Sequence, residues 1–313
     1  MIDLHELRRL TFSSSHADVP DHLSAASGIV VAGEFLYVIA DDDLHLGVFD
    51  AAGQRDGFKV HLFPGDLPDD PAARKAQKPD LEALVRLPPF AGYPSGALLA
   101  FASGSRSNRQ TGALLRLDDS GALRGSPRAV DLSALYAPLQ RRFPGLNIEG
   151  AAVCDQRIVL LQRASRGHPE NALIRLPLAD VLQALGAADE LQLPELPVEL
   201  STIELGQIGD VPLGFTDAAA LPDGRLVFSA VCESVDGTYH DGPCVGAAVG
   251  ILGTDGQVQR LDFVRPVRKI EGIDARLDGG FVRLLLVSDA DDRSRPGGLF
   301  SAALPWASEK KPP

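Results

Sequence analysis

One pattern recurs five times along the 313-residue chain and limits the folds that the chain can adopt. A polar residue opens each copy, small and apolar residues follow, and a turn leads into a strongly β-forming run. The opening residues lie 55, 67, 67 and 55 positions apart and are Ser27, Glu82, Glu149, Thr216 (with Asp217 beside it) and Glu271. This even spacing over nearly the whole chain indicates one structural unit repeated five times.

Each copy also contains enough β-forming sequence for four strands. Four-stranded units of this length, joined by Gly, Asp and Pro turns, are typical of β-propeller blades. The last copy lacks an outer strand, whereas the chain begins with a spare β-prone run, LRRLTF. Pairing this run with the last blade would leave no free sheet edge. We therefore predict an all-β fold, a β-propeller of five blades with four antiparallel strands each, closed by the N-terminal strand.

The predicted propeller is a single domain over residues 1–306, followed by a flexible C-terminal tail at 307–313. Two other all-β folds stay open at this point. One is a propeller of six blades with one degenerate copy, and the other is a β-sandwich or barrel whose strands resemble one another by accident.

Charge and hydropathy exclude several classes of partner. The formal net charge is −12, which disfavours nucleic acid because that binding depends on Lys and Arg at phosphates. Apolar runs such as RLLLVSDA are too short for a membrane helix, which needs roughly 18 to 20 apolar residues. The N-terminus lacks the apolar core of a signal peptide, so we expect a soluble cytoplasmic protein, or a periplasmic or secreted one if a leader has been removed.

Three cysteines, Cys154, Cys232 and Cys244, cannot all pair with one another, which argues against a disulfide framework. One bridge between Cys232 and Cys244 stays open. Their spacing with His240 matches no standard zinc pattern and lacks a fourth ligand.

The repeated polar residues predict a metal site. The first strand of each propeller blade lines the central channel, so equivalent residues from all blades face one axis. Three glutamates that meet there must be protonated, solvated or neutralised by a cation. Ca²⁺ accepts six to eight oxygen ligands and is the expected cofactor. The predicted ligands are Ser27, Glu82, Glu149, Thr216, Asp217 and Glu271. The alternative is that these side chains only cap backbone groups and bind channel water.

Several stretches, in the same order, resemble a known family. They are SGIVVAGEFLYVIADDD, QRASRGHPENALI, GFTDAAALP and KIEGID, and they are similar to the calcium-dependent apyrases, five-bladed propellers that hydrolyse nucleoside diphosphates. This resemblance implies an axial calcium, an acidic catalytic pair in the ADDD run at Asp41 and Asp42, and a functional Arg163. Gln162 stands where that family has another arginine. IEGAAV and IEGIDARLDGGFVRLLLVSDAD are also similar to the phytase-like or esterase-like propeller domains of bacteria.

The residues that could perform chemistry lie at one predicted face. In antiparallel blades, the start of the first strand and the end of the second meet at the same face of the disc. We expect Asp41, Asp42 or Asp289 to activate water, and Arg163 to act on substrate or water. The arginines predicted to bind anionic oxygens of the substrate are Arg106, Arg109 and Arg166.

These residues predict a calcium-dependent hydrolase of a small phosphorylated or otherwise anionic substrate. Two alternatives stay open. One is a non-catalytic propeller in which calcium locks the ring and the loops bind a protein or a sugar. The other is a lactonase-like hydrolase, in which the metal polarises a carbonyl and no arginine is required. The sequence has no G-x-S-x-G elbow, phosphate-binding loop or H-E-x-x-H zinc helix.

Overall fold

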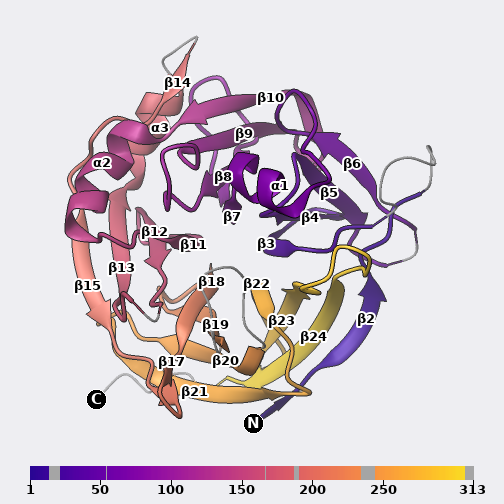
Figure 1. The fold of residues 1–313 in the computed structure, drawn as a ribbon, viewed down its shortest axis with the longest axis vertical. Helices are drawn as coiled ribbons and strands as arrows, with labels where there is room; N and C mark the ends of the chain where they lie inside the picture. Colours follow the sequence, from indigo (N-terminus) through magenta and orange to yellow (C-terminus); the bar gives the residue numbers. More distant parts are fainter. Residues whose placement is uncertain (14–21, 54, 166, 187–189, 234–243, 307–313) are drawn as a thin grey trace.

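Five four-stranded antiparallel blades surround a central axis in the computed structural model (Figure 1). The structure describes residues 1–13, 22–53, 55–165, 167–186, 190–233 and 244–306. The five-bladed prediction is confirmed, and both alternatives, the six-bladed propeller and the β-sandwich or barrel, are wrong. The predicted tail at 307–313 lies outside the described residues.

The blades follow one another along the chain, each running from the axis outward. Blade 1 contains β3 (Ala26–Ala32), β4 (Phe35–Ala40), β5 (His45–Asp50) and β6 (Phe58–His61), and blade 2 contains β7 (Leu81–Leu87), β8 (Ala97–Ala102), β9 (Thr111–Leu117) and β10 (Leu123–Asp131). Blade 3 contains β11 (Ile148–Cys154), β12 (Arg157–Gln162), β13 (Asn171–Pro177) and β15 (Glu199–Ile203). Blade 4 contains β18 (Gly214–Ala220), β19 (Leu226–Glu233), β20 (Cys244–Leu252) and β21 (Val258–Arg265), and blade 5 contains β22 (Ile270–Asp278), β23 (Phe281–Ser288), β24 (Gly298–Pro305) and β2 (His5–Arg9).

The N-terminal segment closes the ring, as predicted. Strand β2 pairs antiparallel with β24, and thus supplies the outer strand of blade 5. The preceding strand β1 (Ile2–Asp3) pairs parallel with β21 of blade 4. The same short segment therefore joins two blades, and both gain a covered edge.

Three helices and a few short strands lie between or beside the blade strands. They are α1 (Pro71–Gln77) between blades 1 and 2, α2 (Ser133–Arg142) between blades 2 and 3, α3 (Leu178–Gly186) within blade 3, β14 (Leu191–Gln192) beside β10, and the hairpin of β16 (Gln207–Ile208) and β17 (Val211–Pro212). In Figure 1, α1 lies near the axis, close to β7 and β3. Among the described residues, no helix is long and apolar enough to span a membrane.

The hydrophobic core lies between neighbouring blades. Tyr37 and Val48 of blade 1 pack in one cluster with Leu84 and Leu98 of blade 2, and the other blade interfaces are built in the same way. No blade can bury both of its faces alone, so the repeats depend on ring closure for their stability.

All five inner strands carry a β-bulge at the same place. The register between the first and second strands of each blade shifts at one residue. The bulged residues are Ser27, Glu82, Glu149, Thr216 and Glu271, the five openers of the sequence repeat. A bulge re-aims a side chain that a regular strand would point into the sheet face, which explains why the repeat places polar residues there.

The three cysteines are free thiols, and Cys232 is buried. The bridge between Cys232 and Cys244 that the sequence left open is not formed. His240 lies outside the described residues.

Candidate functional site

The bulged ends of the inner strands and the ends of the second strands meet at one face of the disc. Four of the blades form an equivalent backbone hydrogen bond there. The amide of the residue after the second strand donates to the carbonyl of the residue two positions before the bulge. The pairs are Asp41 to Ala25 (3.3 Å), Ser103 to Asp80 (2.9 Å), Arg163 to Asn147 (2.9 Å) and Asp289 to Lys269 (3.1 Å). Side chains from both strands of each blade therefore converge on the axis, as the sequence analysis expected.

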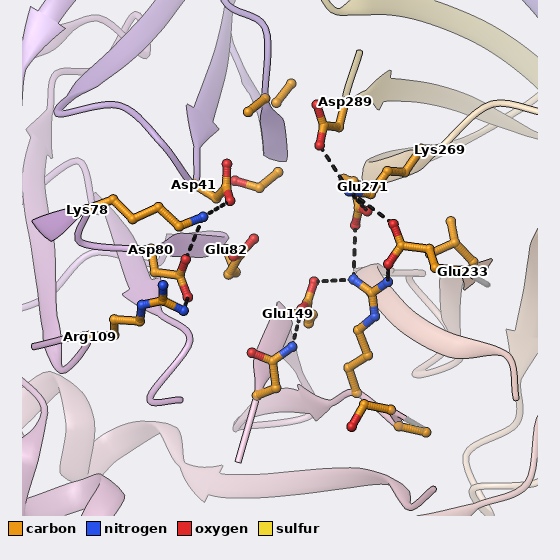
Figure 2. Close-up of a pocket in the computed structure, with 18 of the residues that line it drawn as sticks. Asp41, Lys78, Asp80, Glu82, Arg109, Glu149, Glu233, Lys269, Glu271 and Asp289 are labelled. Carbon is orange, nitrogen blue, oxygen red and sulfur yellow. Dashed lines mark hydrogen bonds and ion pairs between the residues drawn. The ribbon is translucent and has the colours of Figure 1, made fainter. Parts of the chain in front are cut away.

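A cavity of about 280 Å³ lies at this point of convergence (Figure 2). Seven carboxylates and five cationic side chains line it, an excess of two negative charges when all are ionised. The carboxylates are those of Asp41, Asp80, Glu82, Glu149, Glu233, Glu271 and Asp289, and the cations are Lys75, Lys78, Arg109, Arg163 and Lys269.

Arg163 is the centre of one half of the cavity. Its Nη1 donates to Oε2 of Glu149 at 3.0 Å and lies 3.7 Å from Oε2 of Glu271, and its Nη2 donates to Oε2 of Glu233 at 2.5 Å. The three carboxylates come from three different blades. Their charges raise the pKa of Arg163 well above its ordinary value despite burial, so the guanidinium stays charged, and both of its terminal nitrogens are paired with carboxylates.

Lys269 is the second cation of this half. Its Nζ lies 3.1 Å from Glu233, 3.6 Å from Glu271 and 3.0 Å from each of Asp289 and Asp291. Among the described residues, Oε1 of Glu233 and Oε1 of Glu271 accept no hydrogen bond and are compensated by this ion pairing alone. Glu271 is only 5% exposed, so Lys269 is important for keeping its carboxylate in the cavity.

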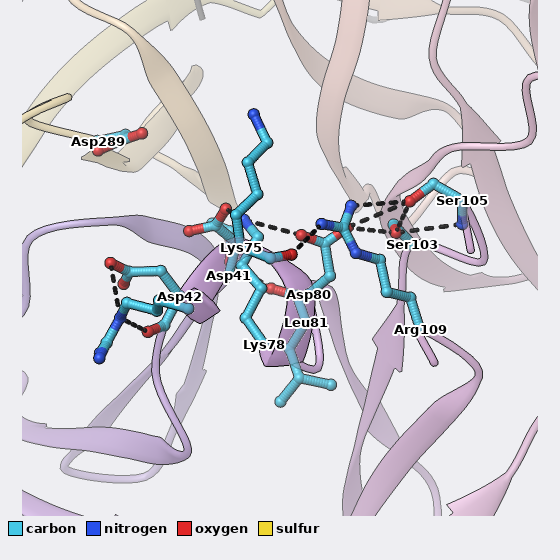
Figure 3. Close-up of polar contacts among 12 residues, drawn as sticks. Asp41, Asp42, Lys75, Lys78, Asp80, Leu81, Ser103, Ser105, Arg109 and Asp289 are labelled. Carbon is cyan, nitrogen blue, oxygen red and sulfur yellow. Dashed lines mark hydrogen bonds and ion pairs between the residues drawn. The ribbon is translucent and has the colours of Figure 1, made fainter. Parts of the chain in front are cut away.

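The other half of the cavity is built around Asp80, which has the uncommon positive φ of 59°. Its Oδ2 accepts from Nη1 of Arg109 at 2.7 Å and from Oγ of Ser103 at 2.5 Å. The ammonium group of Lys78 lies 2.8 Å from Oδ1 of Asp80 and also donates to Asp41 (Figure 3). Lys78 thus links blade 1 to blade 2.

Asp41, Asp80 and Glu82 form the candidate cation site. Their carboxylate oxygens lie within 4.8 Å of one another. Among the residues that the structure describes, Glu82 has no hydrogen-bond or ion-pair partner, whereas Asp41 and Asp80 share Lys78. The ammonium group of Lys78 therefore already contacts two of the three carboxylates that a hard cation would use as ligands.

The predicted ring of six metal ligands is only partly assembled in the cavity. Glu82, Glu149, Glu271 and Ser27 line it, but Thr216 and Asp217 do not. Ser27 and Thr216 donate their hydroxyl hydrogens to backbone carbonyls of the next blade, those of Leu81 (2.7 Å) and Ile270 (2.8 Å).

The side chain of Asp217 also forms hydrogen bonds to backbone groups of the inner strands. Its carboxylate accepts hydrogen bonds from the backbone amides of Ala218 (2.8 Å) and Ile273 (3.0 Å), and the latter belongs to the next blade. Ser27, Thr216 and Asp217 therefore hold neighbouring inner strands together, which is the capping role that the sequence analysis kept as an alternative.

Burial in the cavity raises the pKa of several carboxyl groups. Burial raises the pKa of Glu149 to about 7 against the opposing effect of Arg163, and that of Asp289 to about 7 against Lys269. For Glu82 and Glu271, burial raises the pKa well above its ordinary value, and nearby carboxylates add to the effect. Such perturbed acids in one cavity are typical of functional sites.

The remaining predicted residues lie at different distances from the cavity. Asp42 is outside it, with its pKa raised to about 6 by burial, and its Oδ2 lies 3.7 Å from Nε of Arg74. Arg106 is exposed and does not line the cavity, and Arg109 lines it but is paired with Asp80. Arg166 lies outside the described residues.

Asp80, Asn147 and Lys269 also line the cavity, although the sequence did not predict a role for them. Each stands two positions before a repeated opener, at Glu82, Glu149 or Glu271, so the repeat contained a second signal. Lys75 and Lys78 belong to the α1 segment, which is present in one repeat only and gave no such signal.

Several solved structures are similar to the chain over most of its length, at low sequence identity. It is similar to a luciferin-regenerating enzyme (10% identity, covering 90% of this chain and 92% of that chain, TM-score 0.44) and to the major allergen Mala s 1 of Malassezia sympodialis (11%, 91% and 96%, TM-score 0.47). It is also similar to XC5397 of Xanthomonas campestris, a gluconolactonase (14%, 90% and 72%, TM-score 0.40). No curated protein matches the chain.

The sequence comparison gives no evidence for the apyrase or phytase-like families that the motifs resemble. The matching model is neither that of an apyrase nor that of a phytase-like propeller, and it covers residues 22–304. The chain belongs to this family, which is described as a family of unknown function, DUF6929.

Proposed function

We propose that the axial cavity is the active site of a hydrolase that opens a small ester or lactone with the help of a calcium ion. The observation that carries this proposal is the pairing of two features in one cavity. A group of three close carboxylates includes the unpartnered Glu82, and Asp289, an acid whose pKa is about 7, lines the same cavity.

Asp41, Asp80 and Glu82 would hold the cation. They offer only oxygen donors, which Ca²⁺ prefers, and a bound divalent ion would favour the ionised form of Glu82, whose pKa burial raises. When bound, the ion would supply positive charge to the carbonyl oxygen under attack. Lys78 would have to release Asp41 and Asp80 at least in part, because it contacts both carboxylates.

The internal ion pairs favour a carbonyl centre over a phosphoryl group. Phosphoryl transfer needs positive charge on three equatorial oxygens, usually supplied in part by an arginine. Both arginines that line the cavity are already bound by carboxylates, Arg163 by three of them and Arg109 by Asp80. Opening an ester requires charge on a single oxygen and no free guanidinium, which matches the lactonase-like alternative.

Asp289 is the proposed general base. Its Oδ2 lies 3.0 Å from Nζ of Lys269, which orients the carboxylate, and its side chain is 16% exposed, so water can reach it. A pKa near the working pH suits proton transfer in both directions. The carboxylate would take a proton from water as the water oxygen bonds to the carbonyl carbon. It would then return that proton to the alkoxide oxygen when the carbon–oxygen bond breaks, leaving a carboxylic acid and an alcohol.

The test is a hydrolysis screen of the purified protein with added calcium, using aliphatic lactones, aryl esters and aryl phosphates. We expect turnover of esters or lactones that is lost on chelation and reduced about 100-fold or more in Asp289→Asn, a typical contribution of general base catalysis. Glu82→Gln should abolish calcium binding in a calorimetric titration. Turnover of aryl phosphates alone would contradict the proposal, and so would turnover that survives Asp289→Asn.

A non-catalytic binding function is the second candidate. Four of the five cations that line the cavity are held in ion pairs, and such a network can serve mainly to fix the ring. If calcium raises the melting temperature while no ester, lactone or phosphate is turned over, this second function is the better description.

A further inference from the structure

Lys75 differs from every other cation that lines the axial cavity. Lys78, Arg109, Arg163 and Lys269 each contact at least one carboxylate within 3.0 Å. The ammonium group of Lys75 has no hydrogen-bond or ion-pair partner among the described residues. Figure 3 shows its extended side chain without a dashed line at the terminal nitrogen.

The helix that carries Lys75 is fixed in place. Asp70 caps its N-terminus by accepting from the amide of Ala73 at 2.8 Å, and Nε of Arg74 donates to the carbonyl of Asp42 at 3.0 Å. Two residues of the β8–β9 loop hold the other end of α1. Nδ2 of Asn108 donates to the carbonyl of Ala76 at 3.0 Å, and Nη2 of Arg109 donates to the carbonyl of Lys75 itself at 3.1 Å.

These contacts fasten α1 to blade 1 and to blade 2, so the backbone of Lys75 is positioned while its ammonium group is left unused. Lys75 is half-buried, so its ammonium group can be reached both by water and by a ligand in the cavity. An anionic ligand would gain a charge-assisted hydrogen bond there, which is among the strongest polar contacts.

We propose that Lys75 binds a carboxylate or phosphate group of the ligand, so that the natural substrate of the cavity is a small organic anion. The statement that this anion is a substrate rests on the proposed function. The contact between Lys75 and the anion does not rest on it, since the contact requires only that an anion binds. The ionised carboxylates of the cavity oppose anion binding, and a divalent cation at Asp41, Asp80 and Glu82 would reduce that opposition. Anion binding is therefore expected to be stronger with calcium present.

The experiment is a calorimetric titration of the full chain, with calcium, by two anions that cannot be hydrolysed, phenylphosphonate and phenylacetate. Phenylacetamide is the neutral counterpart. We expect one or both anions to bind, and the tighter one identifies a phosphate-bearing or a carboxylate-bearing substrate. Lys75→Gln should weaken that binding about tenfold or more, as the loss of a charge-assisted hydrogen bond predicts. Lys75→Arg should restore most of it.

Arg86→Gln is the matched control, because it removes one positive charge from an exposed residue of β7, the strand that follows α1, and Arg86 does not line the cavity. Equal affinity in the wild type and in Lys75→Gln would overturn the inference, and so would the absence of binding by either anion. If Lys75→Gln loses the anion while no ester or lactone is ever hydrolysed, the proposed hydrolase fails and the Lys75 contact stands. If hydrolysis of charged and neutral esters is equally unaffected by Lys75→Gln, the hydrolase stands and Lys75 has no part in it.

Discussion

Arg163 donates a 3.0 Å hydrogen bond to Glu149 across the inner strand pair of blade 3, and both groups are almost completely withdrawn from water. The same guanidinium also contacts Glu233 of blade 4 and Glu271 of blade 5. One cation from the end of a second strand therefore neutralises carboxylates of three blades. Arg163 therefore links three blades at the wall of the cavity.

Arg163→Ala should lower the free energy of unfolding by about 3 to 5 kcal/mol, because it leaves three buried carboxylates without their shared cation. Chemical denaturation measures the change. Arg157→Ala in the same blade is the control, since Arg157 forms a solvent-exposed pair with Glu199 at 2.9 Å and should contribute about 1 kcal/mol or less. Equal effects of the two substitutions would show that the axial network adds nothing to stability.

Lys78→Met should tighten the binding of calcium. The ammonium group contacts Asp41 and Asp80, so it competes with any cation for these carboxylates. Removing one positive charge at this distance should raise the affinity about tenfold or more. Titration calorimetry gives the dissociation constant, and Glu82→Gln, which removes a ligand, should change it in the opposite direction. A weaker affinity in Lys78→Met would mean that Lys78 organises the site and does not compete with the cation.

Asp274 should make the stability of the ring depend on pH. It accepts a hydrogen bond from the amide of Val31 in the next blade at 3.0 Å, and burial raises its pKa from 3.8 to about 6. The folded state therefore binds this proton more tightly than the unfolded state does. The stabilisation is complete below pH 3.8 and is lost as the pH rises to about 6.

Asp274→Asn keeps an oxygen acceptor and cannot ionise, so it should remove this part of the pH dependence. At pH 7 the variant should be more stable than the wild type, by on the order of 1 kcal/mol. Urea denaturation of both proteins between pH 4 and pH 7 isolates the contribution of this one group. Parallel stability curves would refute the assignment.

Gly150→Ala should destabilise the ring because inner strands of neighbouring blades touch there. A Cβ atom at Gly150 would lie 2.6 Å from Cα of Asp217, a backbone atom of the next blade. Overpacking of this kind typically costs about 1 to 3 kcal/mol. Gly167→Ala is the control, because no atom lies within 4 Å of the position that its Cβ would take. A melting temperature as high in Gly150→Ala as in Gly167→Ala would contradict this close packing.

The fold and the ring of bulged residues could be read from the sequence. Ser27, Glu82, Glu149, Thr216 and Glu271 recur because each occupies the same bulge of a repeated blade, and a repeat records such equivalence in its spacing. The convergence of Asp41, Arg163 and Asp289 with these residues also followed, because antiparallel pairing brings both strand ends to one face.

The ion-pair partners of these side chains could not be predicted from the sequence repeat. Lys269 of blade 5 pairs with Glu233 of blade 4, Arg163 reaches from blade 3 to Glu271, and Lys78 links Asp41 to Asp80 across two blades. Apart from Lys78 and Asp80, these partners are distant in sequence and belong to different blades, so the local sequence pattern does not predict them. The sequence alone predicted a five-bladed propeller with an acidic axis and left a six-bladed propeller and a β-sandwich or barrel open. The tertiary structure decided which carboxylates pair with the chain's own cations, because ion pairing depends on distances that only the folded ring sets. In the described part of the cavity, it left the ionisable side chains of Glu82 and Lys75 without a hydrogen-bond or ion-pair partner.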